Sequence, residues 1–117
     1  MKFSIIVALY NQLKYLPKLI ESLENQTFKD FEVHFCSDGC DDGTKEFFEK
    51  NYPNFEWQYH RLRNNTGNLA KNFNQGIKKA KGEYCVFIAG DSFPELNYLE
   101  VLDQWVNPDK LICGIRV

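Results

Sequence analysis

The sequence predicts an α/β fold, a Rossmann-like open parallel sheet with helices on both faces. Short apolar, β-rich segments alternate along the chain with segments in which apolar residues recur at helical spacing. The connections between them are short, and this alternation produces parallel strands joined by right-handed crossovers. A chain of 117 residues, 44% hydrophobic and 26% charged, has the size and composition of one globular domain. We therefore expect a single α/β domain over residues 1–117.

Five segments are predicted as strands. The runs at 3–9 and 83–89 are almost continuously apolar, which is typical of strands buried on both faces of a sheet. The run at 31–36 alternates more between apolar and polar residues. The weaker and more polar run at 57–62 is expected at an edge of the sheet, and a fifth strand is expected at 111–117.

Four helices are predicted between these strands. In the first helix, leucines and Ile20 recur at helical spacing, and Pro17 fits only within its first turn. Lys81-Gly82 is expected to close the third helix. The four helices are expected at 13–23, from a cap at Asp41 or Asp42 through Phe47-Phe48, at 69–80 and at 94–105.

Charge and composition exclude several classes of function. Fourteen lysines and arginines against 16 aspartates and glutamates give a net charge of −2. This balance weighs against nucleic-acid binding and against binding to anionic membranes, because both need a cationic surface. The longest apolar runs have about six residues, whereas a transmembrane helix needs about 20, so we expect no transmembrane segment. The N-terminal run lacks a signal-peptide cleavage site and is expected to belong to the mature chain.

The four cysteines are predicted to be free thiols in a reducing, cytoplasmic setting. None of them lies in a CxxC pair, and neither histidine is spaced as a zinc partner. A disulfide or a metal role is the alternative.

Polar loops follow four of the predicted strands. Open α/β sheets bind ligands beyond the carboxyl ends of their strands. Turn chemistry alone explains residues of this kind, so it is their clustering at one edge that indicates a site. The glycine-rich phosphate motifs GxGxxG and GxxxxGK[ST] are absent, and carboxylates that hold a divalent cation are the alternative way to bind phosphates. The loops are 9–12, 37–44, 63–68 and 90–94, each rich in Asn, Asp, Gly or Ser.

Five motifs in order resemble the family 2 glycosyltransferases, which have the GT-A fold. They are the opening strand and Tyr-Asn turn at 4–11, Ser-Leu-x-x-Gln-Thr at 22–27, the Glu-strand-Asp-Asp-Gly-Ser type of motif at 32–44, the block at 65–84, and the Asp-x-Asp position at Asp91. Each motif is weak alone, but together they cover nearly all of residues 3–105 in the correct order. The resemblance is therefore specific.

The resemblance implies that this chain supplies the donor-binding half of an inverting glycosyltransferase. Such an enzyme transfers a sugar from a UDP-, GDP- or dTDP-sugar to a hydroxyl of a glycan or lipid-linked acceptor. Asp38 would accept hydrogen bonds from the base or ribose. Asp91 would hold Mg²⁺ or Mn²⁺, which neutralises charge on the departing nucleoside diphosphate. The implied nucleotide-binding residues are Ala8, Tyr10, Asn11, Asp38, Asn65, Gly67, Lys71 and Asn74.

Four features depart from the family pattern. Ala8 stands where the family usually has proline, and Ser37 occupies the first place of the usual Asp-Asp pair. Ala89 occupies the first place of Asp-x-Asp, so one carboxylate remains and a lower metal affinity is expected. The family normally continues for a comparable length beyond Val117, with the acceptor site and the general base. The catalytic base is therefore expected beyond Val117. The 117 residues themselves are either a naturally short protein or part of a longer one.

Two other functions remain open. The chain alone fits a non-catalytic nucleotide-binding or interaction module, and an unrelated doubly wound protein such as a flavodoxin-like regulator is the third hypothesis. Structural roles also compete for single residues: Asp42 as a helix cap, Asn65 and Gly67 in turns, and Lys71 as a solvated lysine. An unpaired C-terminal strand favours a homodimer. A cytoplasmic location is expected, with the cytoplasmic face of a membrane as one possibility.

Overall fold

The computed structural model describes residues 1–106. Its four strands form one sheet in the order β3-β2-β1-β4, and every neighbouring pair is parallel. This confirms the predicted open parallel α/β sheet and the edge position of β3. The elements are β1 (Phe3–Leu9), η1 (Leu13–Tyr15), α1 (Leu16–Glu24), β2 (Phe31–Asp38), α2 (Thr44–Lys50), β3 (Glu56–Leu62), α3 (Leu69–Ile77), β4 (Tyr84–Ala89) and α4 (Tyr98–Trp105).

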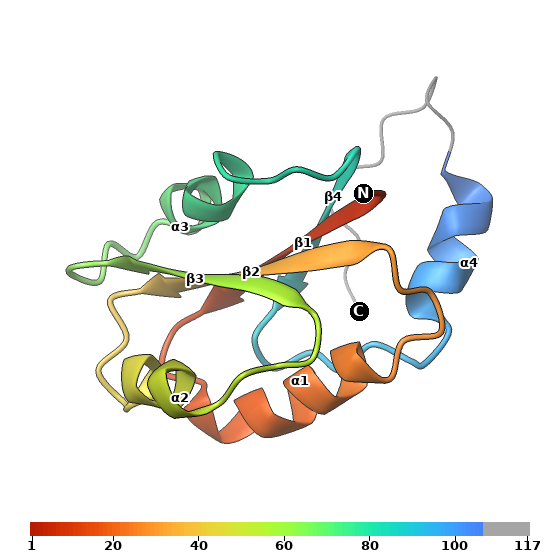
Figure 1. Cartoon of the computed structure of the whole chain (residues 1–117). Helices are drawn as coiled ribbons and strands as arrows, with labels where there is room; N and C mark the ends of the chain where they lie inside the picture. Colours follow the sequence, from red (N-terminus) through yellow and green to blue (C-terminus); the bar gives the residue numbers. More distant parts are fainter. Residues whose placement is uncertain (107–117) are drawn as a thin grey trace.

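Helices cover both faces of the sheet. Figure 1 shows α3 on one face and α1 with α2 on the other. The central strand β1 is buried along almost its whole length, as its continuous apolar run predicts. Because all four strands are parallel, their carboxyl ends lie at the same edge of the sheet.

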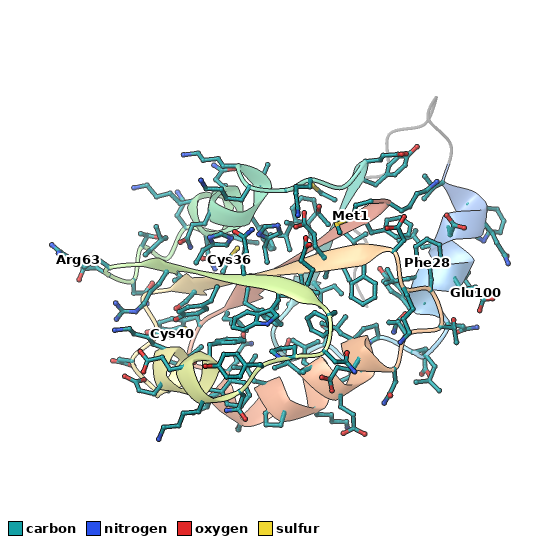
Figure 2. All side chains as sticks on the ribbon, viewed as in Figure 1. Met1, Phe28, Cys36, Cys40, Arg63 and Glu100 are labelled. Atoms are coloured by element: carbon teal, nitrogen blue, oxygen red, sulfur yellow. The ribbon has the colours of Figure 1, made fainter. Side chains whose placement is uncertain are left out.

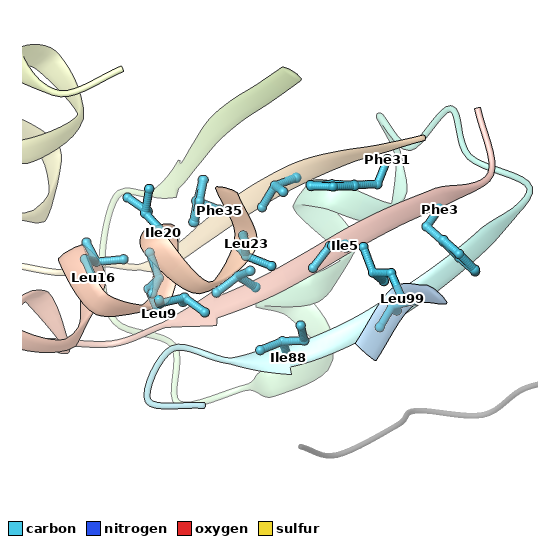
Figure 3. Close-up of a cluster of buried hydrophobic side chains, with 14 of the residues drawn as sticks. Phe3, Ile5, Leu9, Leu16, Ile20, Leu23, Phe31, Phe35, Ile88 and Leu99 are labelled. Carbon is cyan, nitrogen blue, oxygen red and sulfur yellow. The ribbon is translucent and has the colours of Figure 1, made fainter. Parts of the chain in front are cut away.

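The main hydrophobic core lies between the sheet and helices α1, α2 and α4. Alternate residues of β1, namely Phe3, Ile5, Val7 and Leu9, point into it. Leucines of α1 cover them (Figure 3), and Leu99 of α4 joins the same cluster. Pro17 lies in the first turn of α1, as predicted, so the helix loses no hydrogen bond there.

The opposite face of the sheet, beneath α3, is more polar. Ser4 Oγ donates a hydrogen bond to Glu32 Oε2 at 2.6 Å, and the Lys81 backbone N–H donates to the same oxygen at 2.6 Å. Burial alone would raise the pKa of Glu32, but these hydrogen bonds and the neighbouring His34 outweigh it and hold that pKa low. The chain that leaves α3 is thereby attached to β1 and β2.

Gly76 lets α3 lie close to the sheet. A Cβ at this position would lie 2.9 Å from both Cys36 Sγ and His34 Cβ, which is closer than carbon and sulfur atoms normally approach. The glycine therefore sets the distance between α3 and β2, and with it the position of the first turn of α3.

Several boundaries differ from the sequence-based prediction. The third helix ends at Ile77 rather than at residue 80. The fourth begins at Tyr98 rather than at residue 94, and the residues before it are held as an irregular segment by Gln26, whose amide donates to the Glu95 carbonyl at 2.6 Å. The expected strand at 111–117 lies outside the described residues.

Two further predictions, free cysteines and the absence of a transmembrane helix, concern residues that the structure describes. Cys36, Cys40 and Cys85 are free thiols, as predicted. Within residues 1–106, none of the helices has the length and apolarity that crossing a membrane would require.

Candidate functional site

A cavity of about 470 Å³ opens at the carboxyl edge of the sheet. This volume lies in the range of small-molecule sites, and the place is where open α/β sheets bind ligands. The ends of β1, β2 and β4 meet there with the loop that follows β3 and the first turn of α3. The lining residues are Ala8, Leu9, Tyr10, Gln12, Asp38, Asn65, Gly67, Leu69, Asn72 and Ala89.

Asp38, the last residue of β2, organises the floor of this cavity. Its side chain is 7% exposed. Oδ1 accepts hydrogen bonds from the backbone N–H and the hydroxyl of Thr66, both at 2.9 Å, and Oδ2 accepts one from the Gly67 N–H at 3.1 Å. A carboxylate offers about four acceptor positions, so one position on Oδ2 remains for a ligand.

The loop after β2 lies against the loop after β3. Gly39 has a φ of +67°, and a Cβ there would collide with the backbone of Asn64 and Asn65. This close approach requires glycine in both conformation and size. It places Asn65 and Gly67 beside Asp38, although 27 or more residues separate them in the sequence.

The loop after β1 is fixed to the loop after β2. Asn11 has a φ of 50°, and its side-chain oxygen accepts a hydrogen bond from the Asp41 N–H at 3.1 Å. The Asn11 N–H lies 3.4 Å from Cys40 Sγ, whose own thiol points to the Leu9 carbonyl. Asn11 thus shapes the loop that presents Tyr10, and it does not line the cavity itself.

Asp42 also joins these two loops. It accepts hydrogen bonds from the Thr44 hydroxyl at 2.6 Å and from the Leu13 N–H at 3.0 Å. Burial acts to raise the pKa of Asp42, but the hydrogen bonds from Thr44 and Leu13 prevail, so the pKa lies below its usual value. The N-cap of α2 is Gly43, without a side-chain cap, so the prediction that Asp41 or Asp42 caps this helix is wrong. Asp42 lies one residue earlier and accepts a hydrogen bond from the Thr44 N–H at 3.3 Å.

Apolar side chains form the rim of the cavity. Tyr10, in the loop after β1, is 49% exposed, and Leu69, the first residue of α3, is 59% exposed. Exposed apolar side chains of this size beside a concave polar floor are suited to holding a flat ring.

Asn72 is a site residue that the sequence analysis missed. It is 3% exposed, and its amide donates to the Cys36 carbonyl at 3.0 Å. Gln75 extends this contact, since its amide donates to Asn72 Oδ1 at 2.7 Å and to the Ser37 carbonyl at 3.2 Å. Asn72 and Gly76 are four residues apart and lie on the same side of α3, the side that contacts the sheet, where an amide needs partners.

The structure places five of the predicted nucleotide-binding residues around the cavity. These are Ala8, Tyr10, Asp38, Asn65 and Gly67. Three others do not line it: Asn11 supports a loop, and Lys71 and Asn74 are exposed on α3.

Asp91 follows β4 in an exposed turn at the same edge of the sheet. Ala89, two residues earlier, lines the cavity. Over residues 1–106 there is no cluster of three or more His, Cys, Asp or Glu side chains arranged to hold a metal. A cation at Asp91 would therefore need oxygens from water or from a bound phosphate to complete its shell.

Three relatives share much of this sequence. The chain is 36% identical over 95 residues to the poly(ribitol-phosphate) β-N-acetylglucosaminyltransferase TarS of Staphylococcus aureus. The aligned residues cover 80% of this chain and 17% of TarS. It is 34% identical over 107 residues to the glycosyltransferase GlyG of Streptococcus pneumoniae, covering 88% of this chain and 34% of GlyG. It is 34% identical over 115 residues to the cholesterol galactosyltransferase of Borreliella burgdorferi, covering 97% of this chain and 32% of that protein.

Solved structures of TarS have the same fold. The crystal structure of S. aureus TarS 1–349 in complex with UDP superposes with a TM-score of 0.82 at 33% identity, over 90% of this chain and 32% of that chain. The complex of TarS 1–349 with UDP-GlcNAc matches equally well, over 31% of that chain. The present chain thus spans about a third or less of the length of the relatives named here.

These likenesses agree with the site geometry. Five of the residues that the resemblance assigns to nucleotide binding line the cavity at the carboxyl edge of the sheet, and the structural match has 33% identity. The sequence model of glycosyl transferase family 2 matches residues 4–117, almost the whole chain. The chain therefore belongs to glycosyl transferase family 2 and shares the fold of TarS over 90% of its residues.

Proposed function

We propose that this chain binds the nucleoside diphosphate part of a sugar donor in the cavity at the carboxyl edge of its sheet. The transfer it serves is an inverting one, from a nucleotide-diphospho-sugar to an acceptor hydroxyl. The observation that carries the proposal is the arrangement at Asp38, a nearly buried carboxylate with one acceptor position left facing the cavity.

A nucleobase fits the chemistry of this position. Uracil, thymine and guanine each carry a ring N–H that needs an acceptor, and a hydrogen bond to a charged acceptor contributes about 1.5–3 kcal/mol. Tyr10 and Leu69 offer apolar surface to the faces of the ring. The relative TarS has been solved with UDP and with UDP-GlcNAc, which supports a uracil base for the present chain as well.

The diphosphate would lie toward β4. Asp91 is the carboxylate nearest in sequence to the Ala89 end of the cavity, and it would hold Mg²⁺ or Mn²⁺ together with phosphate oxygens. The cation would offset the charge that develops on the departing diphosphate. None of the cavity-lining residues other than Asp38 is a carboxylate, so a general base would have to come from another part of the protein.

Titration calorimetry tests this proposal. UDP, GDP and dTDP are each titrated into the chain with and without Mn²⁺. We expect UDP to bind, and to bind more tightly with the metal. Absence of heat in every combination would refute donor binding. Binding of UDP without any effect of Mn²⁺ would support the nucleotide site and refute the metal role of Asp91.

A second candidate function is nucleotide binding without catalysis. The lone Asp91 and the single carboxylate in the cavity favour it for these residues taken alone. Incubation with UDP-GlcNAc distinguishes the two, because a chain that binds this donor and releases no UDP behaves as a binding module.

A further inference from the structure

Charge is strongly segregated along this chain. The 26 residues from 57 to 82 contain six of its 14 lysines and arginines and none of its 16 aspartates and glutamates. The other parts of the sequence then carry eight basic residues against 16 acidic ones. The overall net charge of −2 does not reflect this uneven distribution. The prediction against binding to nucleic acids and anionic membranes rested on the overall net charge alone.

The fold gathers this segment on one side of the molecule. It comprises β3 from Trp57 onward, α3, the connection between them and the residues after α3 up to Gly82, so it forms one edge of the sheet and the cover of one face. Glu56, the first residue of β3, lies just outside it. We call this surface the basic face. Its cations are Arg63, Lys71, Lys78, Lys79 and Lys81, and all five are exposed. Arg61 alternates on β3 with Trp57 and Tyr59 and therefore lies on the other face of the sheet.

Helix α3 presents its lysines to solvent. Asn72 and Gly76 are buried and mark the side of the helix that contacts the sheet. At 100° per residue, Lys71 and Lys78 lie on the opposite side, about 10 Å apart along the axis. Nitrogen-tipped side chains project from the outer side of α3 in Figure 2, and Arg63 extends from the tip beyond β3. The separation of Lys71 and Lys78 is about one Debye length, so these two cations act together on an anionic surface.

The basic face is almost free of internal charge pairing. Lys81 forms an ion pair with Glu56 at 2.6 Å. Within residues 1–106, the ion pairs include no partner for the other four cations. Their charge is available to an outside partner.

The exposed apolar residues on this side are aliphatic. Leu69 is 59% exposed and Ile77 is 40% exposed, at the two ends of α3. The aromatic residues of β3, Trp57 and Tyr59, point to the other face, where both pack against Phe48. Single-stranded nucleic acids are held by exposed aromatic platforms, whereas lysines combined with aliphatic side chains on a helix suit the interface of a lipid bilayer.

We propose that the basic face docks the protein on a membrane surface that contains anionic lipids. The helix α3 would lie along the headgroups, with Lys71, Lys78 and Lys79 toward the phosphates. The helices α1 and α4, which carry more acidic than basic residues, would then face away from the bilayer. This inference is independent of nucleotide binding, since Lys78 and Lys79 lie at the end of α3 that is remote from the cavity.

Vesicle sedimentation tests the inference with the 117-residue chain. Vesicles of phosphatidylcholine alone are compared with vesicles that also contain phosphatidylglycerol. We expect binding only to the anionic vesicles, and release when salt is added. Each basic residue near such a surface strengthens binding about fivefold, so the double substitution Lys78→Gln/Lys79→Gln should weaken binding about 25-fold.

A matched control removes the same charge from the opposite face. Lys45→Gln/Lys50→Gln changes two exposed lysines of α2 and should weaken vesicle binding by less than about threefold. Circular dichroism and thermal melting confirm that both variants are folded. Equal binding to neutral and anionic vesicles, equal losses in the two variants, or binding to single-stranded RNA with none to vesicles would overturn the proposal.

Discussion

Replacing Asp38 with asparagine tests the central contact of the site. Asparagine keeps the shape of aspartate but replaces one oxygen with an NH₂ group and removes the charge. If the remaining oxygen stays toward Thr66, the NH₂ group faces the Gly67 N–H, which now lies 3.1 Å from Oδ2. Two donors then face each other, one hydrogen bond is lost, and the two bonds from Thr66 become neutral ones.

The structure gives a magnitude for this change. A hydrogen bond to a charged acceptor contributes about 1.5–3 kcal/mol and a neutral one about 0.5–1.5 kcal/mol. With the middle of each range, one lost and two weakened bonds amount to about 5 kcal/mol before water replaces any of them. Thr66 and Gly67 are exposed, so water replaces part of what they lose, and we expect the free energy of unfolding to fall by about 2 kcal/mol.

Two assays follow from this reasoning. Urea denaturation measures the loss of stability, and calorimetry with UDP in the absence of metal measures nucleotide binding, which should weaken by about tenfold or more. Asp41→Asn is the matched control, because Asp41 is exposed and its carboxylate accepts no hydrogen bond from residues 1–106. If Asp38→Asn behaves like Asp41→Asn in both assays, Asp38 does not organise the site.

Three further predictions concern other parts of the molecule. Asp91→Asn should remove the effect of Mn²⁺ on UDP affinity and leave metal-free binding unchanged, as calorimetry will show; a loss of metal-free binding instead would place Asp91 in the nucleotide site itself. Gly76→Ala should lower the free energy of unfolding in urea by about 1–2 kcal/mol, because overpacking against Cys36 and His34 outweighs the gain of about 1 kcal/mol in helix propensity; an increase in stability would contradict the close packing of α3. The pKa of His60 lies below its usual 6.5, first because the side chain is partly buried and then because of the charges of His34 and Lys79. Protonation therefore favours the unfolded chain, and the free energy of unfolding should decline as the pH falls below about 6.5. The decline should be smaller in His60→Gln, and identical pH profiles of the two proteins would count against this linkage.

The sequence predicted the sheet and most of its helices from local patterns. The continuous apolar run of β1 identified a strand buried on both faces, and the polar run of β3 identified an edge strand. These predictions succeed because the burial of side chains along a strand or a helix follows the period of that element, and the sequence of apolar and polar residues shows this period directly. Boundaries were less certain, as at the start of α4, because Gln26 holds residues before Tyr98 in an irregular segment from 69 positions away.

Two properties of this protein were decided only by the tertiary structure. The sequence placed Asp38 at the end of a strand, but its three donors come from Thr66 and Gly67, and they reach it because Gly39 allows two loops to touch. The net charge of −2 also weighed against anionic partners, whereas the fold gathers five exposed cations on the basic face. Motif identity and strand burial depend on neighbours in the chain, so the sequence alone determined them. Hydrogen-bond partners and surface fields depend on neighbours in space, which only the folded chain brings together.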